Sequence, residues 1–309
     1  MTQDWRPKGL GGSRPRRLNK RAVNGYLFIA PAMIFMFSFI IYPLVNTLYL
    51  SLTEYNFVYS ESPKFIGLSN YSAMFKDARF HEALFRTGEF TLWFFPPLII
   101  CSLFVALLLN TQIKGWRIFQ SVLFMPSVVP LSISGILFVW ILDPQFGVFN
   151  EVLKTIGLSS LARPWLREPS VAMKAIAGVS FWKYAGFNIV LFLAGLQAIP
   201  TQLYESAKLD GASFWQEILY ISLPSIRETF ITVSIWSIIV TLKSFTQMFV
   251  MTAGGPARAT TVLYHYIYEV VFNFYKLGYG AALAYFLAIM IFAISVLATR
   301  VVGWKGEQQ

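Results

Sequence analysis

The sequence predicts an all-α polytopic membrane protein, and its composition, its apolar runs and the placement of its basic residues favour this fold class. Of the 309 residues, 56% are apolar and 13% are charged, whereas about a quarter of the residues are charged in an average soluble protein. Most of the surface therefore cannot face water. The polar stretches are too short for a soluble domain of about 150 residues, so we expect one membrane domain.

Six apolar runs are long enough to cross a bilayer, which takes about 20 residues of helix. They predict transmembrane helices at residues 26–50, 88–111, 117–142, 172–198, 225–250 and 279–303. An even number of spans places both termini on one side of the membrane. The second run contains Pro96 and Pro97, which should kink or break it, although neighbouring helices can satisfy the carbonyl groups that proline leaves free.

Residues 1–25 form a basic arm with seven Lys or Arg. A signal peptide is disfavoured because the apolar run that follows is long enough to span and no small-residue cleavage site closes it. A nucleic-acid-binding arm rests on charge alone. Basic residues concentrate on the cytoplasmic side of membrane proteins, so we expect both termini and the segment near 200–224 to be cytoplasmic, with residues 26–309 forming the membrane domain.

The stretch YESAKLDGASFWQEILYISLP, residues 204–224, is a polar interruption on this cytoplasmic side. Thr201 can cap a short helix, and Asp210-Gly211 should end it because glycine adopts the left-handed conformation without steric cost. Ser213 and Gln216 have the spacing of a capping box that opens a second helix. The sequence therefore predicts a helical hairpin that projects into the cytosol.

Two aromatic residues, Phe214 and Trp215, lie at the tip of this hairpin. A simple connection between two spans is the alternative, but it would need only about two to eight residues. Exposed aromatic side chains on a water-facing loop usually indicate a protein partner. We therefore expect the hairpin to dock on another protein.

This stretch resembles the EAA-type motif of permease subunits in bacterial ATP-binding-cassette importers that depend on a binding protein. Ser206 stands where that family usually has alanine. The similarity extends to the first span, to FIGLSNYSAMF as a strand-like segment after it, and to VMTAGGPARATTVLYHYIYEVVF as the external Gly-Gly-Pro loop of maltose-type permeases. It covers nearly the whole chain after Gly25 and implies the type I importer permease fold.

The resemblance implies that the hairpin is a coupling helix seated in a cleft of the nucleotide-binding subunit. Glu205 would orient that joint through a salt link, Gly211 would permit close approach, and Phe214 with Trp215 would anchor it. The matching coupling positions are Glu205, Ala207, Asp210, Gly211, Ala212, Phe214 and Trp215, and Gly254, Gly255 and Pro256 match the external loop.

The resemblance also places a substrate path along the fourth and fifth spans. The matching positions are Trp182, Lys183, Gly186, Asn188, Ser237, Thr241, Lys243, Ser244 and Gln247. Spacings of three and four put the hydroxyl and amide groups of the fifth span on one helix face. Close packing of helices in lipid is the alternative role for such small polar residues.

Lys183 and Lys243 fall inside predicted spans, where an isolated charge is costly and must be compensated. Snorkelling to an interface is one explanation, particularly for Lys183. If both lysines face the path, an anionic sugar derivative such as a uronate, a sulfonate or a phosphate ester becomes a plausible substrate. A neutral sugar or oligosaccharide is the ordinary expectation for the family.

Two other classes of function find less support. An ion-coupled secondary transporter would need paired carboxylates inside the membrane or inverted repeats with broken helices, and we find neither pattern. A membrane enzyme would need a metal or nucleophile motif, and His81 and His265 are the chain's two histidines. We expect both at the water interface, with no metal site.

The chain contains no GxxxxGK[ST] loop, the usual phosphate-binding segment of an ATPase. The resemblance implies that ATP and Mg²⁺ bind to two separate ATPase subunits. It also implies a second related permease subunit, an extracytoplasmic solute-binding protein, a sugar substrate and a place in the bacterial inner membrane. No nucleic-acid partner and no cofactor bound by this chain are expected.

Overall fold

The computed structural model describes residues 20–111 and 114–303 and divides into two compact units, residues 1–49 and 50–309. Most of the predicted basic arm, residues 1–19, lies outside the described residues. The first unit is one apolar helix built from α1 (Lys20–Met36), a π turn η1 (Phe37–Ile41) and α2 (Tyr42–Ser51). Its apolar side chains are exposed over residues 24–51, as expected of a helix that faces lipid.

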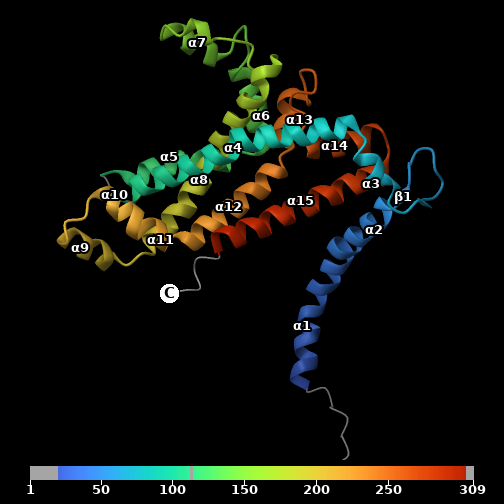
Figure 1. Cartoon of the computed structure of the whole chain (residues 1–309), viewed down its shortest axis with the longest axis horizontal. Coiled ribbons are helices and arrows are strands. Elements are labelled where there is room, and N and C mark those ends of the chain that lie inside the picture. Colours follow the sequence, from blue (N-terminus) through green and yellow to red (C-terminus); the bar gives the residue numbers. More distant parts are fainter. Residues whose placement is uncertain (1–19, 112–113, 304–309) are drawn as a thin grey trace, which may run out of the picture. The chain divides into compact units, whose positions relative to one another are not determined.

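The second unit is helical apart from one short two-stranded β-ribbon, formed by β1 and β2 (Figure 1). Its elements are β1 (Thr53–Glu54), β2 (Lys64–Phe65), α3 (Ser69–Met74), α4 (Ala78–Asn110), α5 (Trp116–Val128), α6 (Leu131–Ile141), α7 (Val148–Thr155), η2 (Ser159–Leu161), α8 (Pro169–Gln197), α9 (Thr201–Leu209), α10 (Phe214–Glu217), η3 (Ile218–Ser222), α11 (Leu223–Ser225), α12 (Arg227–Leu242), α13 (Thr246–Thr252), α14 (Leu263–Tyr268), η4 (Glu269–Asn273) and α15 (Leu277–Gly303).

The all-α prediction is confirmed except for this ribbon, in which Thr53 pairs with Phe65 in an antiparallel register. The segment 65–75 was expected to be strand-like, but most of it forms α3. Asn70 at the start of α3 donates to the carbonyls of Ser51 and Thr53 at 2.9 and 2.8 Å. These bonds join the start of α3 to the end of α2 and to β1.

Four helices among the described residues are long and apolar enough to cross a membrane, and six spans result if each of two bent helix pairs counts as one. Helix α4 begins at Ala78 instead of residue 88 and continues through Pro96 and Pro97 without a break. The proline pair therefore does not break the helix. Its neighbour α8 packs along this stretch and supports it.

The third predicted span is broken instead. Helices α5 and α6 meet at an angle of 98°, because Val129 precedes Pro130 and takes an extended conformation with ψ of 130°. A residue before proline is disfavoured in the helical region. The fifth predicted span is also wrong in its bounds, since α12 ends at Leu242 and α13 starts separately at Thr246.

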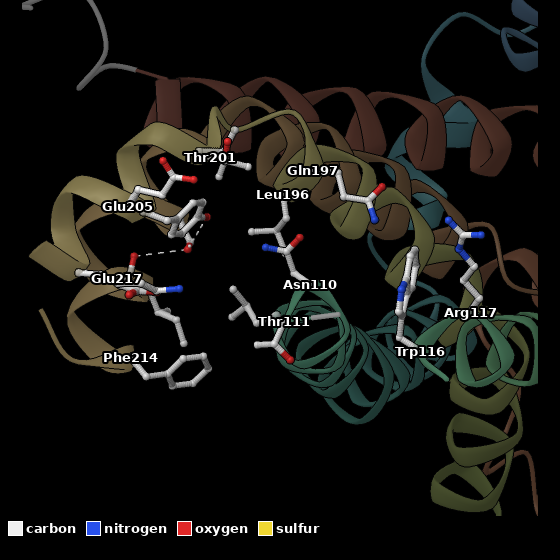
Figure 2. Close-up of a pocket in the computed structure, with 16 residues that line it drawn as sticks. Asn110, Thr111, Trp116, Arg117, Leu196, Gln197, Thr201, Glu205, Phe214 and Glu217 are labelled. Carbon is white, nitrogen blue, oxygen red and sulfur yellow. Dashed lines mark hydrogen bonds between the residues drawn. The ribbon is translucent and has the colours of Figure 1, made fainter. Parts of the chain in front are cut away.

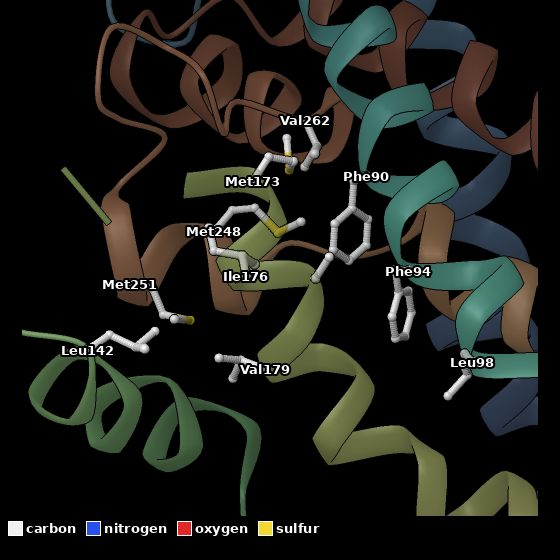
Figure 3. Close-up of a cluster of buried hydrophobic side chains, with 11 residues drawn as sticks. Phe90, Phe94, Leu98, Leu142, Met173, Ile176, Val179, Met248, Met251 and Val262 are labelled. Carbon is white, nitrogen blue, oxygen red and sulfur yellow. The ribbon is translucent and has the colours of Figure 1, made fainter. Parts of the chain in front are cut away.

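Helix α4 is the common support of the second unit. Phe90, Phe94 and Leu98 pack against side chains of α8 and α13 in one buried cluster (Figure 3). Residues earlier in α4 pack on α3, α14 and α15, and residues later in α4 pack on the ends of α8 and α12. Helices α8, α12 and α15 of this unit thus all pack on α4.

Asp77 ties the start of α4 to two later segments. Its carboxylate accepts hydrogen bonds from the hydroxyls of Tyr266 at 2.5 Å and Tyr279 at 2.7 Å, and from the backbone N–H of Arg79 at 2.9 Å. Burial alone would raise the pKa of Asp77, but these hydrogen bonds outweigh it and hold the pKa below its ordinary value. The carboxylate therefore stabilises the contact of α4 with α14 and α15.

Replacing Asp77 with alanine should lower the free energy of unfolding by about 1–3 kcal/mol, because it leaves the buried Tyr266 hydroxyl without an acceptor. The difference from wild type should be full above the ordinary carboxyl pKa of about 4 and shrink as the pH falls through the lowered pKa. Thermal unfolding of the purified protein at neutral and acidic pH measures both effects.

A double variant, Asp77→Ala with Tyr266→Phe, is the matched control for this interaction. It should cost less than the sum of the two single changes, because the second change removes the unpaired hydroxyl. Additive losses, or a difference from wild type that does not depend on pH, would contradict the assigned role of the carboxylate.

Candidate functional site: a polar hairpin and the helices that meet it

Residues 200–224, here called the polar hairpin, fold as the local sequence signals predict. Helix α9 ends at Asp210, and Gly211 adopts a φ of 80°. Helix α10 begins with the expected capping box, in which the backbone N–H of Ser213 donates to Oε1 of Gln216 at 2.7 Å. The predicted cap at Thr201 is wrong, because Pro200 occupies the N-cap position and no side chain caps α9.

The hairpin exposes a series of apolar side chains. Phe214 is 43% exposed and Trp215 is 62% exposed, and Leu209 before the turn is 90% exposed. The Tyr204 hydroxyl lies 3.0 Å from the Ser222 hydroxyl, which in turn donates to the Glu217 carbonyl at 3.3 Å. These bonds hold α9 against η3, so the apolar tip is presented on a fixed support.

A cleft of about 830 Å³ separates the polar hairpin from the end of α4 and the start of α5. Figure 2 shows Glu205 and Phe214 on the hairpin side, and Thr111 and Arg117 on the helix side. Charged groups of both signs therefore line its walls. A smaller cavity of about 330 Å³ is lined by four other predicted coupling residues, Ala207, Asp210, Gly211 and Ala212.

The helix side of the cleft was not predicted from the sequence. Asn110, Thr111, Trp116 and Arg117 line it together with the hairpin. The one sequence feature that could have indicated them is the short loop between the second and third predicted spans. Its basic residues favour the cytoplasmic side, where the hairpin is also expected. Hydropathy gives no indication that this loop and residues 201–222 lie close together in the fold.

The predicted path residues of α8 face three different neighbouring helices. Asn188 donates to the Ser237 hydroxyl of α12 at 2.8 Å. Gly186 faces α5, and a Cβ atom there would lie 2.0 Å from the Leu123 carbonyl oxygen. Trp182 is 38% exposed and packs edge-on against Phe138 of α6, with 5.0 Å between ring centroids.

Lys183 is buried and does not snorkel. Its ammonium donates to the backbone carbonyls of Pro126, Ser127 and Val129 at 3.0, 2.7 and 2.5 Å. These carbonyls lie at the break between α5 and α6. Lys243 differs, because it is exposed at the end of α12.

The polar residues of the fifth predicted span do not share one helix face. Thr241 donates to the Ser237 carbonyl within α12 at 2.7 Å, and Ser244 donates to the Val240 carbonyl at 3.0 Å after the helix has ended. Gln247 belongs to α13, where it is buried and its amide nitrogen has no hydrogen-bond acceptor among the described residues. The helix break after Leu242 interrupts the predicted stripe.

The Gly-Gly-Pro segment forms a compact loop between α13 and α14. Gly254 has a φ of 83°, and its carbonyl accepts from the Thr261 hydroxyl at 3.1 Å. Gly255 and Pro256 are joined by a cis peptide bond. A Cβ atom on Gly254 would lie 2.9 Å from the ring of His265, so the loop packs closely on α14.

His265 does not lie at a water interface as expected. It is 3% exposed, and burial lowers the pKa of its imidazole. His81 is exposed, and its Nε2 lies 2.9 Å from the Phe75 carbonyl oxygen. Across residues 20–111 and 114–303, no three His, Cys, Asp or Glu side chains gather as a metal site would require.

Comparison with known proteins assigns the membrane helices to a family. Residues 71–304 match the model of the inner membrane component of binding-protein-dependent transport systems. The sulfoquinovosyl glycerol transport system permease protein SmoG of Agrobacterium fabrum is 35% identical, over 89% of this chain and 87% of its own length. The trehalose/maltose transport system permease protein MalF of Thermococcus litoralis is 33% identical, over 91% and 94%.

A solved structure supports the same assignment. A bacterial ABC transporter involved in the import of the acidic polysaccharide alginate contains a chain of 25% identity that superimposes with a TM-score of 0.80, over 93% of this chain and 98% of that one. The importer permease fold expected from the sequence is confirmed, as is the place in the inner membrane. The chain is a transport component and not an enzyme, and it belongs to the family of inner membrane components of binding-protein-dependent transport systems.

Proposed function

We propose that the chain is the permease subunit of an ATP-driven importer that moves a sugar or oligosaccharide across the membrane. The observation that carries this proposal is family membership over most of the chain, joined to a capped polar hairpin with exposed Phe214 and Trp215. The relatives named above transport a sulfoquinovosyl glycerol and the disaccharides trehalose and maltose. A carbohydrate is therefore the substrate class that we assign.

The polar hairpin is the proposed docking element for an ATPase subunit in the cytoplasm. Glu205, Gly211 and the exposed aromatic pair present charge, a compact turn and apolar area on one support. Such a combination suits a partner cleft with an apolar floor and a basic rim. ATP and Mg²⁺ would bind in that partner.

The complete importer in this proposal contains two ATPase subunits, a second related permease subunit and an extracytoplasmic solute-binding protein. Each permease contributes one hairpin to one ATPase subunit. The loop of Gly254, Gly255 and Pro256 would then face the binding protein. The family description, which names dependence on a binding protein, supports this arrangement.

Reconstitution tests the whole assembly. Complexes purified from native membranes and placed in liposomes should take up radiolabelled oligosaccharide only when ATP and the binding protein are both present. Uptake driven by an ion gradient without ATP would instead favour a secondary transporter. Purification of the chain without any ATPase subunit would also overturn the proposal.

The substrate path in this proposal runs between α8 and α12. Asn188 and Ser237 bond to each other across this contact, and Thr241 lies one turn further along α12. The path would open when these helices separate and their polar groups exchange partners for sugar hydroxyls. Lys243, Ser244 and Gln247 are the further positions that we assign to the path, whereas Trp182 and Gly186, also predicted for it, face α6 and α5.

Changing Gly211 to aspartate, or Glu205 to lysine, should uncouple ATP hydrolysis from transport while leaving membrane insertion intact. A side chain at a φ of 80° is strained, and the lysine reverses a charge at the proposed joint. We expect uptake to fall by about tenfold or more, as for the loss of an interface hot spot. ATPase activity and uptake are measured in the same liposomes.

Gly157→Asp is the matched control. Gly157 follows α7 with a φ of 84°, and both glycines have open space around the position of a Cβ atom. This variant carries the same strain and charge away from the hairpin, so it should transport normally. Normal transport by both hairpin variants would exclude the coupling role.

An anionic sugar derivative is the second candidate substrate, and the exposure of Lys243 favours it. Lys243 ends α12 beside the buried Ser244. A cation there would attract a carboxylate or sulfonate group on the substrate. The acidic polysaccharide named for the solved structure is of this chemical class.

Lys243→Met distinguishes the two substrate classes. If the substrate is anionic, this change should reduce its uptake by about tenfold, because the attracting charge is lost. Uptake of a neutral oligosaccharide should not change. Lys243→Arg keeps the charge and should retain anionic uptake, and equal uptake of the anionic substrate by wild type and Lys243→Met would exclude this second candidate.

A further inference from the structure

Pro130 creates a deficit of hydrogen-bond donors inside the bent α5–α6 pair. In a continuous helix, the N–H of residue 130 would donate to the carbonyl of Pro126, but proline has no N–H. The backbone offers that carbonyl a long hydrogen bond instead, from the Val129 N–H at 3.3 Å. The bend of 98° carries the amides of α6 away from the remaining carbonyls of α5. Within a membrane no water replaces them, so each unpaired carbonyl is costly.

Lys183 supplies the missing donors from a different helix. A lysine ammonium has three N–H groups, and here they meet three carbonyls, those of Pro126, Ser127 and Val129, within 3.0 Å. The side chain is 7% exposed. The negative end of a helix dipole also favours a cation at this position, so the carbonyls compensate the charge as the charge satisfies the carbonyls.

Neighbouring contacts fix the ammonium at this place. The Ser127 hydroxyl donates back to the Lys183 carbonyl at 3.1 Å. One turn along α8, Gly186 allows the backbone of α5 to approach, since any Cβ atom would collide with the Leu123 carbonyl. Trp182 packs on Phe138 of α6, so adjacent residues of α8 hold both arms of the bend.

We infer that Lys183 is a positioning residue, a tethered cation that replaces the donors lost at Pro130 and keeps α5 and α6 at their bend. This inference goes beyond the proposed transport function. It requires no contact between the lysine and the substrate. It makes the bend dependent on one ammonium group supplied by α8.

Amide hydrogen exchange of the purified protein tests this role without any transport assay. Lys183→Met keeps most of the side-chain length but removes all three donors. We expect exchange in peptides covering residues 120–135 to accelerate by about tenfold or more, because the last turn of α5 then opens locally. Peptides from residues 280–295 should exchange as in wild type.

Lys174→Met is the matched control, because it makes the same change on the same helix. The ammonium of Lys174 lies over the Trp93 ring at 4.9 Å and meets no carbonyl of the bend. Exchange at residues 120–135 should not change in this variant. Lys183→Arg keeps a cation with several donors and should leave exchange close to wild type.

Chemical rescue decides the case if Lys183→Met fails to fold. Lys183→Ala leaves space for the lost part of the side chain, which propylammonium matches in length. Added propylammonium should return slow exchange to residues 120–135, whereas it should not rescue Lys183→Met, in which the space is filled. Unchanged exchange in both variants, or accelerated exchange in Lys183→Ala that propylammonium does not reverse, would overturn the inference.

A substrate-binding role for Lys183 gives a different result. In that case Lys183→Met would raise the substrate concentration needed for half-maximal uptake while exchange at residues 120–135 stayed as in wild type. This outcome would also overturn the positioning role. Because the exchange measurement needs neither ATP nor substrate, failure of the inference is distinguishable from failure of the proposed transport function.

Discussion

The fold depends on one constraint, that backbone carbonyl groups inside a membrane must find their donors within the protein. Helix α4 stays unbroken although Pro96 and Pro97 each remove one donor, and α8 packs along it. The bend between α5 and α6 does not meet the constraint alone, because Pro130 removes a donor where the chain turns by 98°. Lys183 satisfies the carbonyls on one side of that bend. A charge that would be unfavourable in lipid is stabilising here, because its partners are fixed dipoles of the backbone.

Local signals predict the polar hairpin well, because its structure is decided by residues close in sequence. Ser213 and Gln216 form the capping box, and Gly211 takes the left-handed turn. The bends were not predicted, because hydropathy responds to composition over about 20 residues and not to backbone direction. Residues 117–142 are apolar on both sides of Pro130, so they resemble one span. The proline itself was the available signal, and its effect differs from that of Pro96 because Val129 becomes extended.

The role of Lys183 could not be derived from sequence for a different reason. Its acceptors lie 54 to 57 residues away along the chain, and every intramembrane lysine gives the same signal whether it snorkels, faces a path or caps a helix. Only packing of α8 on α5 through Gly186 decides among these. His265 shows the same limit, since its burial follows from the close approach of the Gly254 loop. The chemistry of a side chain predicts that it requires a hydrogen-bond or charge partner when it is buried. The fold determines which neighbouring residue is that partner.

Helix α5 links the hairpin cleft to the bend. Its first turn, with Trp116 and Arg117, lines the cleft beside the polar hairpin, and its last turn receives the ammonium of Lys183. The 13 residues of α5 span about 20 Å as one stiff helix. A displacement of the hairpin that moves the first turn of α5 would therefore also move its last turn, at the bend, by a similar amount. Since α8 holds the far end through Lys183 and Trp182, such a displacement must either move α8 with α5 or change the angle at Pro130.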